Sequence, residues 1–310
     1  MGQRPRCFKP DTVYEQTQRT VDRQFLFAPI PGVRNAIGAS AARALQKHPV
    51  KLFWLEVNSN HEHIGIAALS GRKEHIENLV HFKRTYHRLL AEEINRLHDR
   101  SGAIFSTTAR TTECLDDESC EAQMFYALLN PVKDNLVERV EHWQGFSSYS
   151  QCARGIDELY TYYDRTAYHK QRNKPEAKPL EHFKVSIRLE FSRLPHLERM
   201  SEGKYQTHLR REVKRRECAF REERTGNRCT VLGKVKLSKT NPRNRPTNPK
   251  KSDAKPLCHC TCNVRREQYK EAMKVYYSEY IIASVAYRAG AYDTKFPYGS
   301  IRPAVPGVSG

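Results

Sequence analysis

The chain has 310 residues and carries 53 Lys and Arg against 35 Asp and Glu, which gives a formal net charge of +18. Hydrophobic residues make up 38% of the chain, below the usual share of a globular protein, so part of it should lie outside a packed core. The sequence has no run near the roughly 18 apolar residues of a membrane span and no secretory signal. We therefore expect a cytoplasmic protein that does not contact membranes, and a charge this high favours a polyanionic partner such as nucleic acid.

Hydrophobic patterning in the first 130 residues predicts alternating strands and helices. Strands are predicted at 24–30, 50–57, 61–69 and 101–109, and helices at 33–47, 74–99 and 115–132. We expect Asp116 or Asp117 to cap the last helix, and Asn130-Pro131 to end it. The order β-α-β-β-α-β followed by a helix predicts an α+β fold. Its sheet should be antiparallel and ferredoxin-like, with helices on one face and the other face free for a site.

Beyond residue 150 the pattern weakens and the chain becomes strongly basic. Helices are predicted within 185–224 and over 266–290, and the stretch 236–256 has the composition of a flexible segment. Residues 204–255 hold 17 Lys and Arg against 5 Asp and Glu, which accounts for two thirds of the net charge. We therefore predict a basic C-terminal extension that is partly helical and partly disordered.

Four cations of this extension are candidates for binding a phosphate backbone. They are Arg243, Arg245, Lys250 and Lys251. Such contacts would add affinity that depends on salt and not on base sequence. The alternative is a solvated linker without a nucleic-acid role, and the composition leaves both open.

Nine cysteines are present, and in a cytoplasmic protein they should be reduced. The segment CHCTC, from Cys258 to Cys262, resembles a metal-binding run. Structural zinc sites usually space two cysteines by two to four residues, whereas the spacing here is C-x-C-x-C without a second pair. We favour free thiols in a loop or strand over a zinc site.

Two histidines, His61 and His63, stand one residue apart in a predicted strand. Alternate residues of a strand share a face, so both imidazoles should lie on the same side of the sheet. Two neutral imidazoles on an open face form half of a divalent-metal site. The alternative is a pair of histidines that only contact solvent or neighbouring polar groups.

Tyr126 and Asn130 are four residues apart and should share one face of the predicted helix. A tyrosine hydroxyl next to a metal is able to attack a phosphodiester and form a covalent intermediate. The side-chain oxygen of Asn130 suits a hard cation such as magnesium. Alternatively, Tyr126 is a packed aromatic and Asn130 only ends the helix.

The segments "SNHEHIGI" and "MFYALLNPVKDNLVERVEHWQGFSSYS", some 60 residues apart, together resemble the single-tyrosine HUH transposases. The closer resemblance is to the REP-associated tyrosine transposases, a group of bacterial insertion-sequence and mobile-element enzymes. It covers roughly residues 14–152, which suggests a transposase domain there and an extension over 153–310. "FPYGSIRP" near the C-terminus is also similar to a tail of some relatives.

The resemblance implies a role for each matching residue. His61 and His63 would bind a divalent metal, Mg²⁺ or Mn²⁺, with Asn130 as a third ligand. Tyr126 would be the nucleophile that cleaves single-stranded DNA, leaves a 5′-phosphotyrosine link and a free 3′-hydroxyl, and allows a second transesterification to rejoin ends. The substrates would be single strands or hairpins in the nucleoid, and a homodimer is an expected possibility. No nucleotide cofactor is needed, and the sequence contains no G-x-x-x-x-G-K-[ST] loop.

One residue departs from the family pattern. The middle position of the HUH motif is normally hydrophobic, and here it is Glu62. We expect its carboxylate to reach solvent at the sheet edge or to pair with a Lys or Arg, because an unpaired buried charge is costly. Two other functions stay open: a catalytically silent DNA-binding protein on the same scaffold, and a nickase of the replication-initiator or relaxase type.

Overall fold

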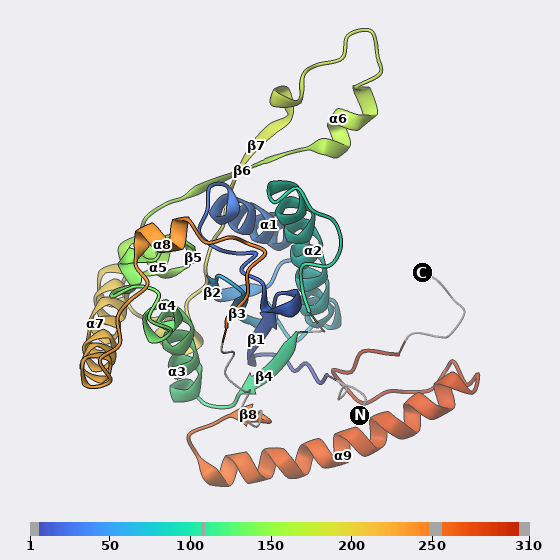
Figure 1. The fold of residues 1–310 in the computed structure, drawn as a ribbon. Coiled ribbons are helices and arrows are strands. Elements are labelled where there is room, and N and C mark those ends of the chain that lie inside the picture. The colour runs from blue at the N-terminus through green and yellow to red at the C-terminus, as the bar shows by residue number, and fades with distance from the viewer. Residues whose placement is uncertain (1–5, 107–108, 248–255, 304–310) are drawn as a thin grey trace.

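The computed structural model describes residues 6–106, 109–247 and 256–303, and it shows a mixed α+β chain built on a six-stranded sheet (Figure 1). The strand order is β5-β2-β3-β1-β4-β8. The strands are β1 (Val13–Arg19), β2 (Lys51–Asn58), β3 (His61–Ala67), β4 (Arg110–Cys114), β5 (Phe146–Ser147) and β8 (Cys258–His259). All neighbours are antiparallel except β8, which pairs with β4 in parallel.

Two strand predictions are wrong. Residues 24–30 form turns and not a strand, and the first strand is β1 instead. β1 is central and covered on both faces, so its polar residues Glu15, Gln16 and Gln18 are buried and hide the strand from a hydrophobicity pattern. The predicted strand at 101–109 is replaced by β4, and of this range residues 107–108 lie outside the described part of the chain.

Two helices cover one face of the sheet, as Figure 1 shows. They are α1 (Val33–Lys47) and α2 (Lys73–Leu97), close to their predicted ranges. Their apolar side chains meet Ile64 and Ile66 of β3 and Leu55 and Val57 of β2 in one core cluster. Side chains alternate along a strand, so the residues between these on β2 and β3 point to the opposite face of the sheet.

The expectation of helices on one face only is wrong, because the opposite face is covered by α3 (Asp117–Leu128), with the single turn α4 (Asn130–Lys133) directly after it. Asp116 caps α3 by accepting a hydrogen bond from the Ser119 backbone N–H, in agreement with the predicted start. A second core cluster lies here and includes Trp54, whose ring packs over Gly65. A Cβ at Gly65 would lie 2.2 Å from ring carbons of Trp54, so only glycine fits at this position.

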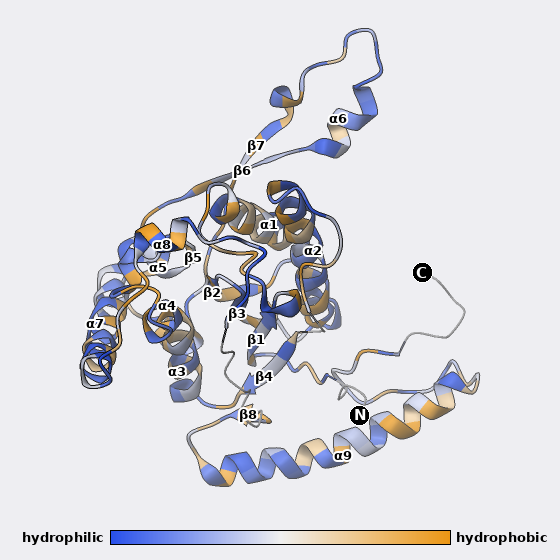
Figure 2. Ribbon diagram, in the orientation of Figure 1, coloured by the Kyte–Doolittle hydropathy of each residue, from blue (hydrophilic) through white to orange (hydrophobic). Residues whose placement is uncertain are grey.

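The rest of the chain surrounds the sheet. Its helices are α5 (Tyr149–Arg154), α7 (Glu202–Gly226), α8 (Lys234–Ser238) and α9 (Asn263–Arg288). Helix α7 packs beside α4 and α5, while the chain returns to the sheet edge at β8, next to α9. The helix predicted within 185–224 is confirmed only for its second part, because 184–188 is a strand. Figure 2 shows that α7 and the first half of α9 are predominantly hydrophilic. Of the predicted flexible stretch, residues 248–255 lie outside the described part of the chain.

A two-stranded hairpin extends away from the rest of the molecule (Figure 1). It consists of β6 (Leu159–Tyr163) and β7 (Lys184–Arg188), with α6 (Arg165–Gln171) between them. In the described part of the chain, no helix is both long enough and apolar enough to cross a membrane.

Candidate active site

β3 presents His61 and His63 on the face that α3 covers. Their ring centroids are 5.3 Å apart, and the rings are nearly perpendicular, at 78°. His63 is 7% exposed, and His61 lies nearer to solvent at the start of the strand. The structure thus brings the two predicted histidines side by side, as strand alternation requires.

His63 is oriented by Glu15 of β1. The ring nitrogen Nδ1 lies 2.8 Å from Glu15 Oε1, and Glu15 Oε2 lies 2.9 Å from Nε2 of His259 on β8. An ionised carboxylate only accepts hydrogen bonds, so His63 donates from Nδ1–H, and Nε2 is the ring nitrogen that Glu15 does not engage. A carboxylate behind a ligating histidine is a common way to fix the tautomer that binds a metal.

The pKa of Glu15 is compatible with this role. Burial acts to raise it, but hydrogen bonds from His259 and His63 and their charges outweigh burial and lower it to about 2. Sequence reasoning missed both Glu15 and His259. His259 is 244 residues from Glu15 and carried no local signal, whereas Glu15 was hidden in a strand that hydrophobicity did not reveal.

His61 is oriented in a similar way by the turn before it. Its Nδ1–H donates to Asn60 Oδ1 at 2.8 Å, while Asn58 Nδ2 approaches its Nε2 at a long 3.4 Å. Burial of the ring, with the charges of His63 and Arg19, lowers the pKa of His61 to about 3. The imidazole is therefore neutral at physiological pH, which is the form that binds a metal.

Tyr126 on α3 stands next to this pair. Its ring centroid is 5.7 Å from that of His63, with the rings nearly perpendicular. Although most large apolar side chains of α3 are buried, Tyr126 is 42% exposed, so it reaches the surface beside the histidines. The ammonium group of Lys133 lies over the Tyr126 ring, 4.1 Å from its centroid, which places a positive charge close to this side chain. The alternative of a fully packed aromatic does not describe Tyr126.

Asn130 begins the turn α4, four residues after Tyr126, and is 3% exposed. Its Nδ2 is buried and has no hydrogen-bond partner among the residues that the structure describes. The nitrogen and oxygen of a side-chain amide have nearly the same shape, so either orientation fits the site. An unsatisfied buried amide is costly without a ligand, and an oxygen turned toward a cation would remove that cost.

These residues fit a divalent cation, although they do not form a complete site of the usual ligand types. Within the described residues, no group of three or more His, Cys, Asp and Glu side chains is placed to hold a metal. The two oriented imidazoles and the buried amide of Asn130 are donor types that Mn²⁺ accepts, and the amide oxygen also suits Mg²⁺. Any ligands beyond these three side chains would have to come from the substrate or water.

Glu56 is a further buried acid on this face, directly across from His63 in the pairing of β2 with β3. It is fully buried, and neither carboxylate oxygen has a hydrogen-bond partner among the described residues. Burial raises its pKa well above the ordinary value, although the charge of Arg34 acts in the opposite direction. Sequence reasoning did not single it out.

The structure corrects the expectation for Glu62. The side chain does not reach solvent, since it is 1% exposed and points to the α2 face. Nor does it form an ion pair with a Lys or Arg of the described chain. Instead Tyr86 Oη–H donates to Oε2 at 3.0 Å, and His87 Nε2 contacts Oε1. Two polar residues of α2 thus contact the Glu62 carboxylate, and the face that carries the histidines is unchanged.

The basic and cysteine candidates lie elsewhere. Arg243 and Arg245 are exposed in the segment after α8, whereas Lys250 and Lys251 lie outside the described residues. All nine cysteines are free, and the Cys260 thiol donates to Asp116 Oδ2 at 3.0 Å. The segment from Cys258 to Cys262 forms the short strand β8 and the start of a loop.

Neither a protein-family model nor a curated protein matches the chain. Among solved structures, one described as a REP-associated tyrosine transposase bound to a REP hairpin is similar. The identity is 16%, the TM-score is 0.40, and the match covers 50% of this chain and 88% of the other. This similarity is too low to assign a function, so the function has to be argued from the site.

Proposed function

We propose that the protein is a metal-dependent endonuclease and strand-transfer enzyme of the transposase type, acting on single-stranded or hairpin DNA. The observation that carries the proposal is the exposed Tyr126 beside two histidines that Glu15 and Asn60 orient. The sheet order β2-β3-β1-β4 with α1 and α2 on one face supports a ferredoxin-like nuclease domain, which we propose over residues 14–152. The net charge of +18 suits a polyanionic substrate.

In this proposal the Tyr126 hydroxyl attacks the scissile phosphorus. A bond forms between Tyr126 Oη and phosphorus, the bond from phosphorus to the 3′-oxygen breaks, and that oxygen leaves as a 3′-hydroxyl after it takes up a proton. The phenolic proton is released, and a 5′-phosphotyrosine link remains. A second 3′-hydroxyl reverses the step on a new end, so the ester bond is conserved and no nucleotide cofactor is required.

Each remaining group has one task. His61, His63 and Asn130 would hold the divalent cation, which when bound supplies Lewis-acid polarisation of the scissile phosphate. Glu15 and Asn60 keep the two imidazoles in the required tautomer and orientation. The ammonium group of Lys133 attracts the phosphate toward Tyr126.

A covalent-adduct assay tests the proposal. The full chain would be mixed with labelled single-stranded oligonucleotides from the DNA that flanks its own gene, with Mg²⁺ or Mn²⁺ and then with chelator. We expect a slower-migrating protein–DNA band that requires metal and is abolished in Tyr126→Phe. Tyr292→Phe, which changes a tyrosine that is 58% exposed after α9, is the matched control and should keep the band.

Two other functions remain as outcomes of this assay. Binding without an adduct, across several flanking hairpins and both metals, would contradict cleavage and favour a silent DNA-binding protein. An adduct that forms but never transfers to a second DNA end would favour a nickase.

A further inference from the structure

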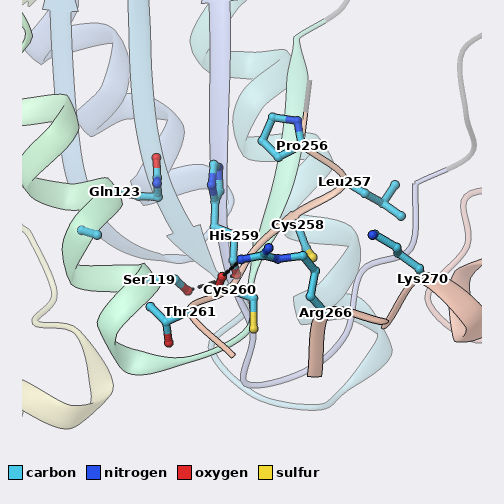
Figure 3. Close-up of a pocket in the computed structure, with 11 residues that line it drawn as sticks. Ser119, Gln123, Pro256, Leu257, Cys258, His259, Cys260, Thr261, Arg266 and Lys270 are labelled. Atoms are coloured by element: carbon cyan, nitrogen blue, oxygen red, sulfur yellow. Dashed lines mark hydrogen bonds between the residues drawn. The ribbon is translucent and has the colours of Figure 1, made fainter. Parts of the chain in front are cut away.

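A pocket of about 400 Å³ lies between α3, β8 and the start of α9 (Figure 3). Ser119 and Gln123 line it from α3, and His259 lines it from β8. Arg266 and Lys270 complete the lining from α9. In Figure 3, Gln123 and Lys270 stand on opposite sides of this space. Of these residues only His259 is linked to the chemistry proposed above, through Glu15, so the pocket needs a separate explanation.

Both sides of the pocket are connected to the proposed catalytic centre, one along α3 and the other through Glu15. Ser119 and Tyr126 are seven residues apart on one face of α3, about 10 Å along the axis at 1.5 Å per residue. This is roughly the length of three stacked nucleotides at 3.4 Å each. On the other wall, His259 is joined to His63 by the two hydrogen bonds of Glu15. The pocket is therefore within reach of a strand that is cut at Tyr126 and runs along α3.

The lining combines positive charge with apolar surface. Arg266 and Lys270 supply cations, and none of the described residues that line the pocket is Asp or Glu. The Lys270 side chain is 43% exposed, and its ammonium group forms an ion pair with Glu267 at 2.7 Å, so an anion in the pocket would compete with Glu267 for it. The apolar part of the wall comes from Ala122, Pro256 and Leu257. Cations beside an apolar wall suit a group that joins a phosphate to a flat, weakly polar ring.

We propose that this pocket binds one unpaired nucleotide of the cut DNA strand, within about three nucleotides of the scissile phosphate. Its base packs against the apolar wall, its phosphate meets Arg266 and Lys270, and the amide of Gln123 contacts the base edge. The assignment rests on the proposed function for the direction of the strand. It gives the C-terminal extension a defined task through β8 and α9, in addition to general electrostatic affinity.

Binding measurements on the full chain test the pocket. In a Tyr126→Phe background, anisotropy of labelled single-stranded oligonucleotides from the gene flanks would be followed over a range of salt. Lys270→Ala should weaken binding about threefold to tenfold and reduce the slope of log K against log salt by about 0.7. Lys274→Ala is the matched control, because Lys274 also bonds the glutamate three residues before it, at 2.7 Å, but lies outside the pocket lining. It should change neither quantity.

A second variant tests whether the pocket contacts the base of the bound nucleotide. Single abasic sites placed at each of the three nucleotides on either side of the cut should reveal one position whose base contributes to affinity. Gln123→Leu should diminish the abasic penalty at that position and at no other. Equal affinity and salt slope in Lys270→Ala and Lys274→Ala, or a uniform abasic scan, would overturn the pocket assignment.

Failure of this inference is distinguishable from failure of the proposed function. If the adduct forms and Lys270→Ala has no effect on binding, nucleotide binding in the pocket is refuted and the proposed cleavage reaction stands. A loss of affinity in Lys270→Ala without any adduct would support a single-strand site here and refute the cleavage reaction.

Discussion

The buried carboxylate of Glu15 makes a quantitative prediction about acid stability. It is 6% exposed, and its bonds to His259 and His63 hold its pKa at about 2, against an ordinary value of 4.5. A carboxyl whose pKa is lower in the folded state stabilises the fold above pH 4.5, and this stabilisation is lost as the pH falls toward 2. The difference between the two pKa values corresponds to about 3 kcal/mol at neutral pH, of which about 1.4 kcal/mol disappears between pH 6.5 and pH 3.5.

Glu15→Gln removes the charge and keeps the size of the side chain. Urea unfolding of both chains in chelator at pH 6.5, 5 and 3.5 should show the variant less stable at pH 6.5, with the gap narrowing by about 1.4 kcal/mol at pH 3.5. Glu92→Gln, at an exposed pair with Arg88, is the control and should cost less than about 0.5 kcal/mol throughout. A gap for Glu15→Gln that stays constant over this range would refute the ionised, doubly bonded carboxylate.

The remaining predictions concern the sheet around the histidines. Glu62→Leu should destabilise the fold by about 1–3 kcal/mol because it leaves the buried Tyr86 hydroxyl without its acceptor, and added Tyr86→Phe should recover much of that loss in urea unfolding; equal loss in the double variant would contradict this pairing. Gly65→Ala places a Cβ 2.2 Å from the Trp54 ring and should cost at least about 1–3 kcal/mol and weaken Mn²⁺ binding measured by calorimetry. Gly203→Ala, with open space around its Cβ in α7, is the control and should be neutral or stabilising.

Much of the local structure could be predicted from the sequence, because it depends on residues close together in the chain. The periodic apolar residues of α1 and α2 predicted both helices, and the alternation of β3 placed His61 and His63 on one face. The four-residue spacing likewise placed Tyr126 and Asn130 one helical turn apart.

The surroundings of these residues were decided only by tertiary structure. β1 contains buried Glu15, whose burial is tolerable because histidines from two other strands bond it, and no hydrophobic pattern signals such a strand. Glu62 is likewise stable because Tyr86 and His87 of α2 reach it.

The same holds for the edge of the sheet. β8 joins β4 from more than 140 residues away and brings His259 beside Glu15, so the orientation of His63 depends on a contact across nearly the whole chain. Local sequence sets which face a side chain occupies, because the strand repeat of two residues and the helix repeat of 3.6 are backbone properties. Which polar groups then meet depends on how distant strands pair, and this pairing is set by the burial of the whole sheet.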